Sequence, residues 1–227
     1  ALELATEDEI SGDSKIGKIE SITFDDVTFG YSDKPVIQHF NMEAKDNIKI
    51  ALMGKNGSGK TTIAKLLLGF YKNYSGSIRF NGIELKTISL SDLRSRVGTV
   101  AQNVVLFTGT LLDNIRYIAP DLKESEIISA LDNAGMDISE FADGLQTMIC
   151  ENGKNLSGGQ KQKIAIARMI VKNPDVMIFD EATSNLDIAT SDIVKKSIRT
   201  LFSEKICIII THDPNIATLA DTVIELK

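Results

Sequence analysis

Short apolar runs alternate with segments of helical periodicity along most of this 227-residue chain. The apolar runs contain few polar residues, which is typical of strands buried on both faces of a parallel sheet. Segments with the 3.6-residue period lie between them, as expected when helices connect parallel strands. Strands are predicted at 48–53, 97–100, 176–179, 205–211 and 222–225, and helices at 61–69, 91–94, 158–172, 188–202 and 214–220. The pattern predicts an α/β fold with a mostly parallel sheet.

The first third of the chain has a second kind of pattern. Apolar and polar residues alternate over 18–29, and residues 36–42 read as another strand. Asn81-Gly82 follows a further alternating run and is a common hairpin turn. These features predict an antiparallel β subdomain at the N-terminal side of the core.

Residues 103–156 differ again, because helical patterns at 110–117, 123–134 and 138–141 follow one another with no strand between them. This segment is expected to be an inserted α-helical subdomain. The resulting division is a polar leader at 1–18, a core at 19–102 and 157–227, and the helical subdomain at 103–156.

The composition is that of an ordinary globular protein, with 43% hydrophobic and 25% charged residues. The net charge of −6 disfavours nucleic acid as a partner. Two cysteines without metal-ligand spacing argue against a disulfide framework and favour a reducing compartment. No apolar run reaches the length of a membrane span, and no secretory signal opens the chain.

Residues 54–62, here called the phosphate loop, have the sequence GKNGSGKTT between a predicted strand and a predicted helix. Glycines allow backbone N–H groups to curl around an anion, and the helix adds its positive N-terminal end. Lys60 can reach terminal phosphates and Thr61 can ligate Mg²⁺. The predicted phosphate contacts are Gly54, Asn56, Gly57, Ser58, Gly59, Lys60, Thr61 and Thr62.

Two adjacent carboxylates, Asp180 and Glu181, end the apolar run at 176–179. Ligands of α/β sheets gather at the carboxyl ends of the strands. Asp180 is suited to hold Mg²⁺, and Glu181 to polarise an attacking water.

A second glycine-rich helix start lies at residues 156–160, LSGGQ, here called the signature segment. Such an end can bind an anion, yet this one has no lysine at the spacing of the phosphate loop and no Mg²⁺ ligand. It therefore looks like half a site. Ser-Gly-Gly is also a good helix start, so the pattern alone leaves a structural role open.

The phosphate loop, the signature segment and the carboxylate pair, in this order, resemble the nucleotide-binding domain of ATP-binding cassette (ABC) transporters over about residues 19–227. The resemblance implies a P-loop NTPase (RecA-like) core that binds ATP and Mg²⁺. It further implies that Tyr31 stacks on adenine, that Gln102 contacts Mg²⁺ or water, and that His212 lies near the γ-phosphate. Asp187 falls in the family's D-loop, 184–187. The implied contacts of the signature segment are Ser157, Gly158, Gly159 and Gln160.

Residues 105–115 resemble the exporter version of the segment after the Q-loop glutamine. Glu151-Asn152-Gly153 resembles the exporters' X-loop, with Asn152 where arginine is usual. Both ends of the chain suggest a domain excised from a longer one, joined to membrane helices before residue 1.

The family implies two such domains arranged head to tail, each phosphate loop closing on the other's signature segment. The expected function is ATP hydrolysis that drives export, on the cytoplasmic side of a membrane, with a second copy and a transmembrane domain as partners. Two alternatives stay open: a soluble cassette ATPase acting in repair or translation, and a P-loop kinase or nucleotide-binding module. The cargo is not readable.

Overall fold

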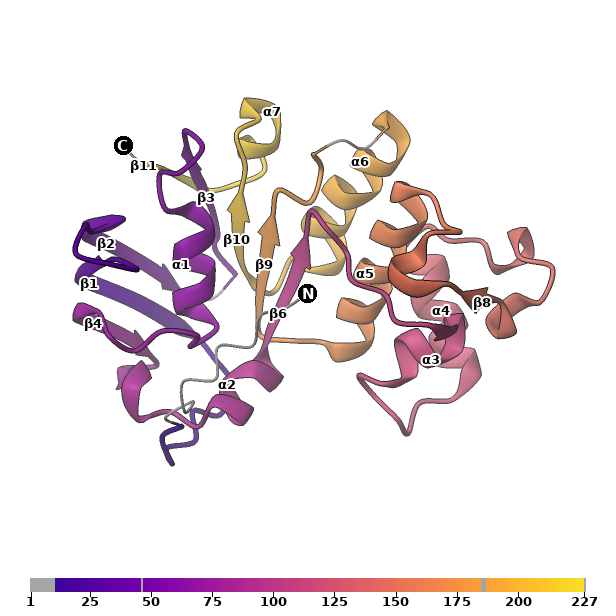
Figure 1. Cartoon of the computed structure of the whole chain (residues 1–227), viewed down its shortest axis with the longest axis horizontal. Helices are drawn as coiled ribbons and strands as arrows, with labels where there is room; N and C mark the ends of the chain where they lie inside the picture. The colour runs from indigo at the N-terminus through magenta and orange to yellow at the C-terminus, as the bar shows by residue number, and fades with distance from the viewer. Residues whose placement is uncertain (1–10, 46, 185–186, 227) are drawn as a thin grey trace.

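A parallel sheet of five strands lies at the centre of the molecule (Figure 1). The computed structural model describes residues 11–45, 47–184 and 187–226. The strand order is β11-β3-β10-β9-β6. These strands are β3 (Lys49–Gly54), β6 (Val97–Ala101), β9 (Val176–Asp180), β10 (Ile206–Ile210) and β11 (Thr222–Leu226). All four pairings are parallel, so the predicted sheet is confirmed.

The two faces of this sheet are covered by different helices. Side chains alternate along β9 and β10, so Ile178 and Ile208 pack on the side of α1 (Lys60–Leu67). Phe179 and Ile209 pack on the opposite side, with α5 (Gly158–Lys172). Figure 1 shows α1 and α5 on either side of the central strands. The sheet therefore separates the start of α1 from the start of α5.

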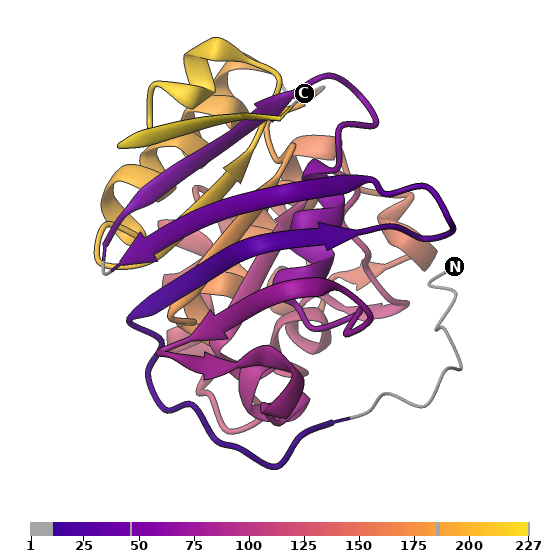
Figure 2. The ribbon, with the colours of Figure 1, turned by 90° about the vertical axis from the view of Figure 1, so that its left-hand side faces the viewer.

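An antiparallel sheet in the order β2-β1-β4-β5 packs over α1 (Figure 2). Its strands are β1 (Ser21–Phe29), β2 (Ile37–Lys45), β4 (Ser75–Phe80) and β5 (Ile83–Glu84). The apolar positions of β1 slip from a spacing of two to three between Phe24 and Val27, and the register shifts there. Asp26 has a φ of 51°, as an extra bulge residue would need. The predicted β subdomain is confirmed, and it contains a β-bulge that the alternating pattern did not predict.

Residues 11–18 lie against the segment after β5. Ser14 pairs with Ile88, and the Ile16 N–H donates to Asp92 Oδ2 over 2.8 Å. The side chain of Ile16 is buried in the core beside the antiparallel sheet. This part of the expected leader thus belongs to the packed structure, whereas residues 1–10 lie outside the described residues.

The segment between β6 and α5 contains the predicted helices and, in addition, a pair of two-residue strands that the pattern did not predict. Its main helices are α3 (Leu111–Arg116) and α4 (Glu124–Asn133), which pack with α5 in one core. The remaining elements of the chain are η1 (Leu85–Thr87), α2 (Leu90–Arg96), β7 (Gly109–Thr110), η2 (Ile138–Glu140), η3 (Gly144–Gln146), β8 (Met148–Ile149), η4 (Glu151–Gly153), α6 (Ile188–Lys196), η5 (Ser197–Leu201) and α7 (Pro214–Ala217). Subdomain boundaries at 102/103 and 156/157 stay predictions.

The predicted helix at 188–202 is present to Leu201, but its geometry changes along its length. It is α-helical to Lys196, and η5 continues it as a π-helical turn. The Ser197 hydroxyl donates to the Ile193 carbonyl over 2.8 Å, and the Phe202 N–H reaches back five residues to Ser197. Side-chain bonding to the preceding turn and one inserted residue widen the helix. Among the described helices, each is too short or too polar to cross a bilayer.

Candidate functional site

The phosphate loop bends back over the start of α1. Its three glycines, Gly54, Gly57 and Gly59, have φ angles of 150°, 84° and 94°. Lys60 lies almost completely inside the loop, and its ammonium donates to the carbonyls of Gly54 at 2.7 Å and Lys55 at 2.9 Å. A buried cation thus has neutral carbonyl oxygens as its partners, so its charge is available to an anion that the N–H groups of the loop would bind.

The loop has no room for side chains at two of its glycines. A Cβ on Gly54 would lie 2.6 Å from both the Leu226 carbonyl oxygen and Ser58 Oγ, and one on Gly59 would lie 3.0 Å from Ile37 Cγ1. Ser58 Oγ is buried and has no hydrogen-bond partner among the described residues. No side chain among the described residues caps the start of α1 either. Unmet donors therefore gather at one helix start, which fits a phosphate ligand.

Asp180 ends β9 beside this helix start. Its Oδ1 lies 3.5 Å from the hydroxyl of Thr61, and its carbonyl accepts a 2.9 Å bond from the Gln102 N–H. The described residues contain no group of three or more His, Cys, Asp or Glu side chains that could hold a metal. Thr61 and Asp180 offer two oxygens of the kind that Mg²⁺ prefers, which fits an ion that takes its other ligands from water and phosphate.

Burial raises the pKa of Asp180 above its ordinary value, and the neighbouring Glu181 carboxylate raises it further. The Thr61 hydroxyl, Lys60 and Lys65 act in the opposite direction. The free protein therefore holds a carboxylate that is disfavoured in its charged form, and a bound cation would relieve this cost.

The variant Asp180→Asn is expected to raise the Tm of the ligand-free protein near neutral pH. A folded-state pKa above the unfolded value means that ionisation of Asp180 costs stability as the pH rises through the unfolded pKa, and the cost is complete above the folded pKa. The gain should therefore shrink as the pH falls to about 3, where both states are protonated. Thermal unfolding at both pH values checks this. An unchanged or lower Tm at neutral pH would contradict it.

Glu181 follows Asp180 in a left-handed backbone conformation, with a φ of 49°. Its N–H donates to the Ile210 carbonyl over 2.9 Å, which ties it to the end of β10. His212 lies two residues after the end of β10, and its Nδ1 is 3.5 Å from Glu181 Oε1. The Ser184 hydroxyl is also 3.5 Å from Glu181 Oε2. The carboxylate is thus aimed by two neighbours while remaining partly exposed.

A cavity of about 730 Å³ brings most of these groups together. Its walls come from the phosphate loop, the ends of β6 and β9, and the turn after β1. The lining residues are Tyr31, Val36, Asn56, Gly57, Gly59, Lys60, Thr61, Thr62, Ala101, Gln102, Asn103, Asp180 and Glu181. The volume is in the range of small-molecule and cofactor sites.

Tyr31 stands at the mouth of this cavity with 51% of its surface exposed. Its hydroxyl lies 3.1 Å from Thr62 Oγ1 in the phosphate loop. Phe29 and Tyr71 support its ring at centroid distances of 5.2 and 5.3 Å. An accessible aromatic face next to a phosphate site suits a nucleotide base.

The signature segment lies elsewhere. Ser157 caps α5, with its hydroxyl oxygen accepting from the Gln160 N–H at 3.1 Å, and Gln160 Oε1 accepts from the Ser157 N–H at 2.9 Å. Gly158 is exposed, and a Cβ there would meet nothing within 4 Å. None of residues 157–160 lines the cavity described above. The structure therefore does not bring the two glycine-rich helix starts of one chain together.

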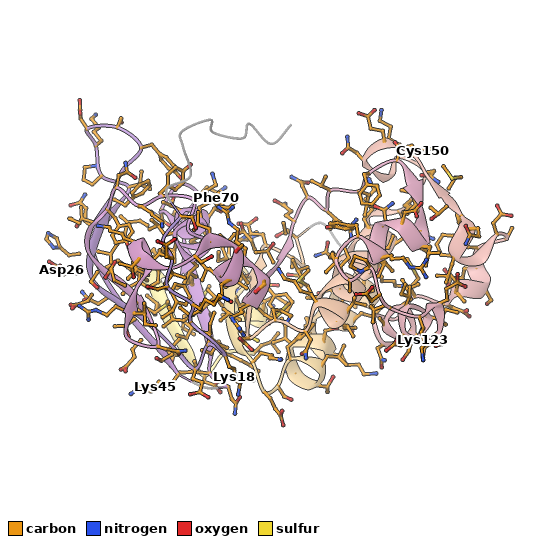
Figure 3. The ribbon with its side chains drawn as sticks, turned by 90° about the horizontal axis from the view of Figure 1, so that it is seen from below. Lys18, Asp26, Lys45, Phe70, Lys123 and Cys150 are labelled. Carbon is orange, nitrogen blue, oxygen red and sulfur yellow. The ribbon has the colours of Figure 1, made fainter. Side chains whose placement is uncertain are left out.

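Five further predicted residues do not line the cavity: Gly54, Ser58, Glu151, Asp187 and His212. Asp187 caps α6, accepting the Thr190 N–H over 2.9 Å, while residues 185 and 186 of the predicted D-loop lie outside the described residues. Glu151 is exposed in η4. Figure 3 shows Cys150, its neighbour, at the opposite end of the molecule from Asp26 of β1.

Sequence reasoning missed two buried polar side chains on α5. Gln162 on α5 is 2% exposed and donates to the Ala182 carbonyl over 2.8 Å. Arg168 is 6% exposed and donates to the main-chain oxygens of Asn114 and Val105, each over 2.8 Å. The available signal was a polar side chain on the apolar face of a helix, because such a residue needs a buried partner.

The comparisons with known proteins agree with this geometry. A family model for the ABC transporter matches residues 37–184, more than half of the chain. The ABC multidrug transporter mdr2 of Aspergillus fumigatus is 40% identical over 210 residues, which are 90% of this chain and 26% of the relative. The ATP-dependent lipid A-core flippase of Francisella novicida is 35% identical over 220 residues, 95% of this chain and 37% of the relative.

A solved structure of a bacterial Atm1-family ABC exporter with ATP bound has a TM-score of 0.89 and 34% identity to this chain. The match covers 96% of this chain and 39% of that one. The chain thus spans between a quarter and two fifths of the length of these relatives. With the P-loop fold, the cavity and these matches taken together, the chain belongs to the ABC transporter family, of which it is the ATP-binding domain.

Proposed function

We propose that this domain binds ATP with Mg²⁺ and hydrolyses it within a head-to-tail pair of two copies. Each active site then consists of the phosphate loop of one copy and the signature segment of the other. The nucleotide enters the cavity with its base against Tyr31 and its phosphates over Lys60.

The separation of the two glycine-rich helix starts carries this proposal. α1 and α5 cover opposite faces of the parallel sheet, and residues 157–160 take no part in the cavity. A helix start that is exposed to solvent and has no lysine of its own binds a free anion in water only weakly. It becomes useful when a second chain presents a phosphate that Lys60 already holds.

Residues of the cavity, His212 beside it and the signature segment of the second copy would divide the work of hydrolysis. Glu181 accepts a proton from the attacking water, and His212, 3.5 Å away, keeps the carboxylate directed. Lys60 exchanges its two carbonyl partners for phosphate oxygens. Thr61, Asp180 and Gln102 would hold Mg²⁺, which when bound neutralises charge on the phosphates. Ser157 and Gly159 donate to the γ-phosphate of the partner's nucleotide.

Export across a membrane is the process that this hydrolysis drives, by likeness to the flippase and the Atm1-family exporter. The domain would work on the cytoplasmic face, attached to a transmembrane region. The exporter-like segments lie on the helical side of the molecule. They suggest that the transmembrane region is contacted by residues 105–115 and Glu151.

Specific ATPase activity is expected to rise with protein concentration and then to level off, because one chain holds only half of each site. The rate per chain should be measured over a dilution series, with sedimentation at the same concentrations to follow the dimer. A rate per chain that stays constant while the dimer dissociates would contradict the shared site.

A further inference from the structure

The loop that carries Glu181 is held by the helix that begins at the signature segment. Gln162 lies one turn into α5 with its side chain buried at 2% exposure. Its Nε2 donates to the main-chain carbonyl of Ala182, the residue directly after Glu181, over 2.8 Å. Ala182 is itself buried. A hydrogen bond out of reach of water thus joins the two elements.

The far end of the same loop also rests on α5. A Cβ on Gly159 would lie 2.6 Å from Thr190 Oγ1 and 3.6 Å from Asp187 Oδ2. Thr190 is buried, and its hydroxyl donates to Asp187 over 2.9 Å. The first turns of α5 therefore touch the described residues on both sides of the loop that links β9 to α6.

Glu181 depends on such support because its backbone is strained. A glutamate with a φ of 49° is held there at a cost that the surroundings must offset. The Glu181 N–H donates to the Ile210 carbonyl, and the Ser184 N–H donates to the Glu181 carbonyl over 3.0 Å. The next peptide is fixed through Gln162. Loss of that bond would remove one of the constraints that keep Glu181 in this strained conformation.

We infer that Gln162 is a positioning residue that couples the signature segment to the Glu181 of its own chain. This inference rests on the proposed function, in which the signature segment of one chain meets the nucleotide of the other. A shift of α5 when it meets that nucleotide moves the Ala182 carbonyl and, with it, Glu181. Occupancy of one site thereby orients the carboxylate of the other.

The variant Gln162→Met tests this coupling, since methionine keeps the length and helix propensity of glutamine but cannot donate. Turnover at saturating ATP, with enough protein to complete the dimer, should fall by about tenfold, the effect of one orienting hydrogen bond. KM for ATP should stay within about twofold, because the ATP contacts are unchanged. In a Glu181→Gln background, the same substitution should leave ATP-dependent dimer formation intact.

Ile166→Val is the matched control, because Ile166 is buried one turn further along α5 and its side chain cannot form a hydrogen bond. It should lower the Tm, as the loss of one buried methylene does, without changing turnover. Unchanged turnover in Gln162→Met, an equal loss in Ile166→Val, or a lost dimer would overturn the inference. If the unsubstituted protein does not hydrolyse ATP, the proposed function itself fails.

Discussion

The variant Glu181→Gln is expected to reduce ATP turnover by about 10²- to 10⁴-fold, the usual contribution of a general base. Glutamine keeps the size of the side chain but cannot accept the proton of the attacking water. The affinity for ATP should persist, because the phosphate loop and Tyr31 are unchanged. Since the ATP that joins the two copies is no longer consumed, the variant should accumulate as an ATP-dependent dimer.

Steady-state ATPase assays, ATP-binding titrations and size-exclusion chromatography with and without ATP check these three outcomes. Glu140→Gln provides the control, since Glu140 is an exposed glutamate of η2 that does not line the cavity and changing it alters the net charge equally. Undiminished turnover in Glu181→Gln would remove the assignment of this residue as the base.

The variant Lys60→Ala is expected to weaken ATP binding by about 10- to 100-fold, because charge-assisted hydrogen bonds to phosphate are lost from a nearly dry position. Hydrolysis and ATP-driven dimer formation should disappear at ATP concentrations that saturate the original protein. The ligand-free fold should also lose some stability, since Lys60 joins the Gly54 and Lys55 carbonyls across the loop.

Isothermal titration with ATP measures the first effect, and thermal unfolding without nucleotide measures the last. Lys195→Ala is a suitable control because Lys195 pairs with Asp192 on α6, outside the cavity. If Lys60→Ala bound ATP as tightly as the original protein, the ammonium would not be part of the phosphate site.

The elements that the sequence predicted best are those in which local pattern and tertiary burial agree. The runs at 176–179 and 205–211 are apolar because both sheet faces are covered, and they are β9 and β10. α5 has the predicted bounds of 158–172, since Ser157 caps its start and Asn173 ends it in a left-handed conformation. The fold class was predictable for this reason.

Deviations from regular geometry were not predictable, because they depend on contacts made over distance. The bulge at Asp26 is accompanied by His39, whose Nδ1 lies 2.8 Å from Asp26 Oδ1 and which also has a positive φ. The π-helical turn after Lys196 depends on how Ser197 and Phe202 fit the core. The local sequence does not show which residues make these contacts.

The site was predicted as separate motifs, and the cavity joins most of them. What motifs could not give is their arrangement: the signature segment stands apart from the phosphate loop of its own chain. The supporting residues Gln162 and Tyr71 also escaped, since each acts through a neighbour. Gln162 contacts a main-chain carbonyl, which can belong to any residue, and Tyr71 supports Tyr31 edge-on at an interplanar angle of 82°.

The alternation along β10 gives the molecule three adjacent spectroscopic reporters. Ile208, Ile209 and Ile210 are consecutive and fully buried, yet Ile208 and Ile210 face the core around α1 while Ile209 faces the core around α5. Isotope-labelled methyl groups on these three neighbours would therefore report rearrangements of the core around α1 and of the core around α5 separately. One strand would report how far a disturbance on one side of the sheet is felt on the other.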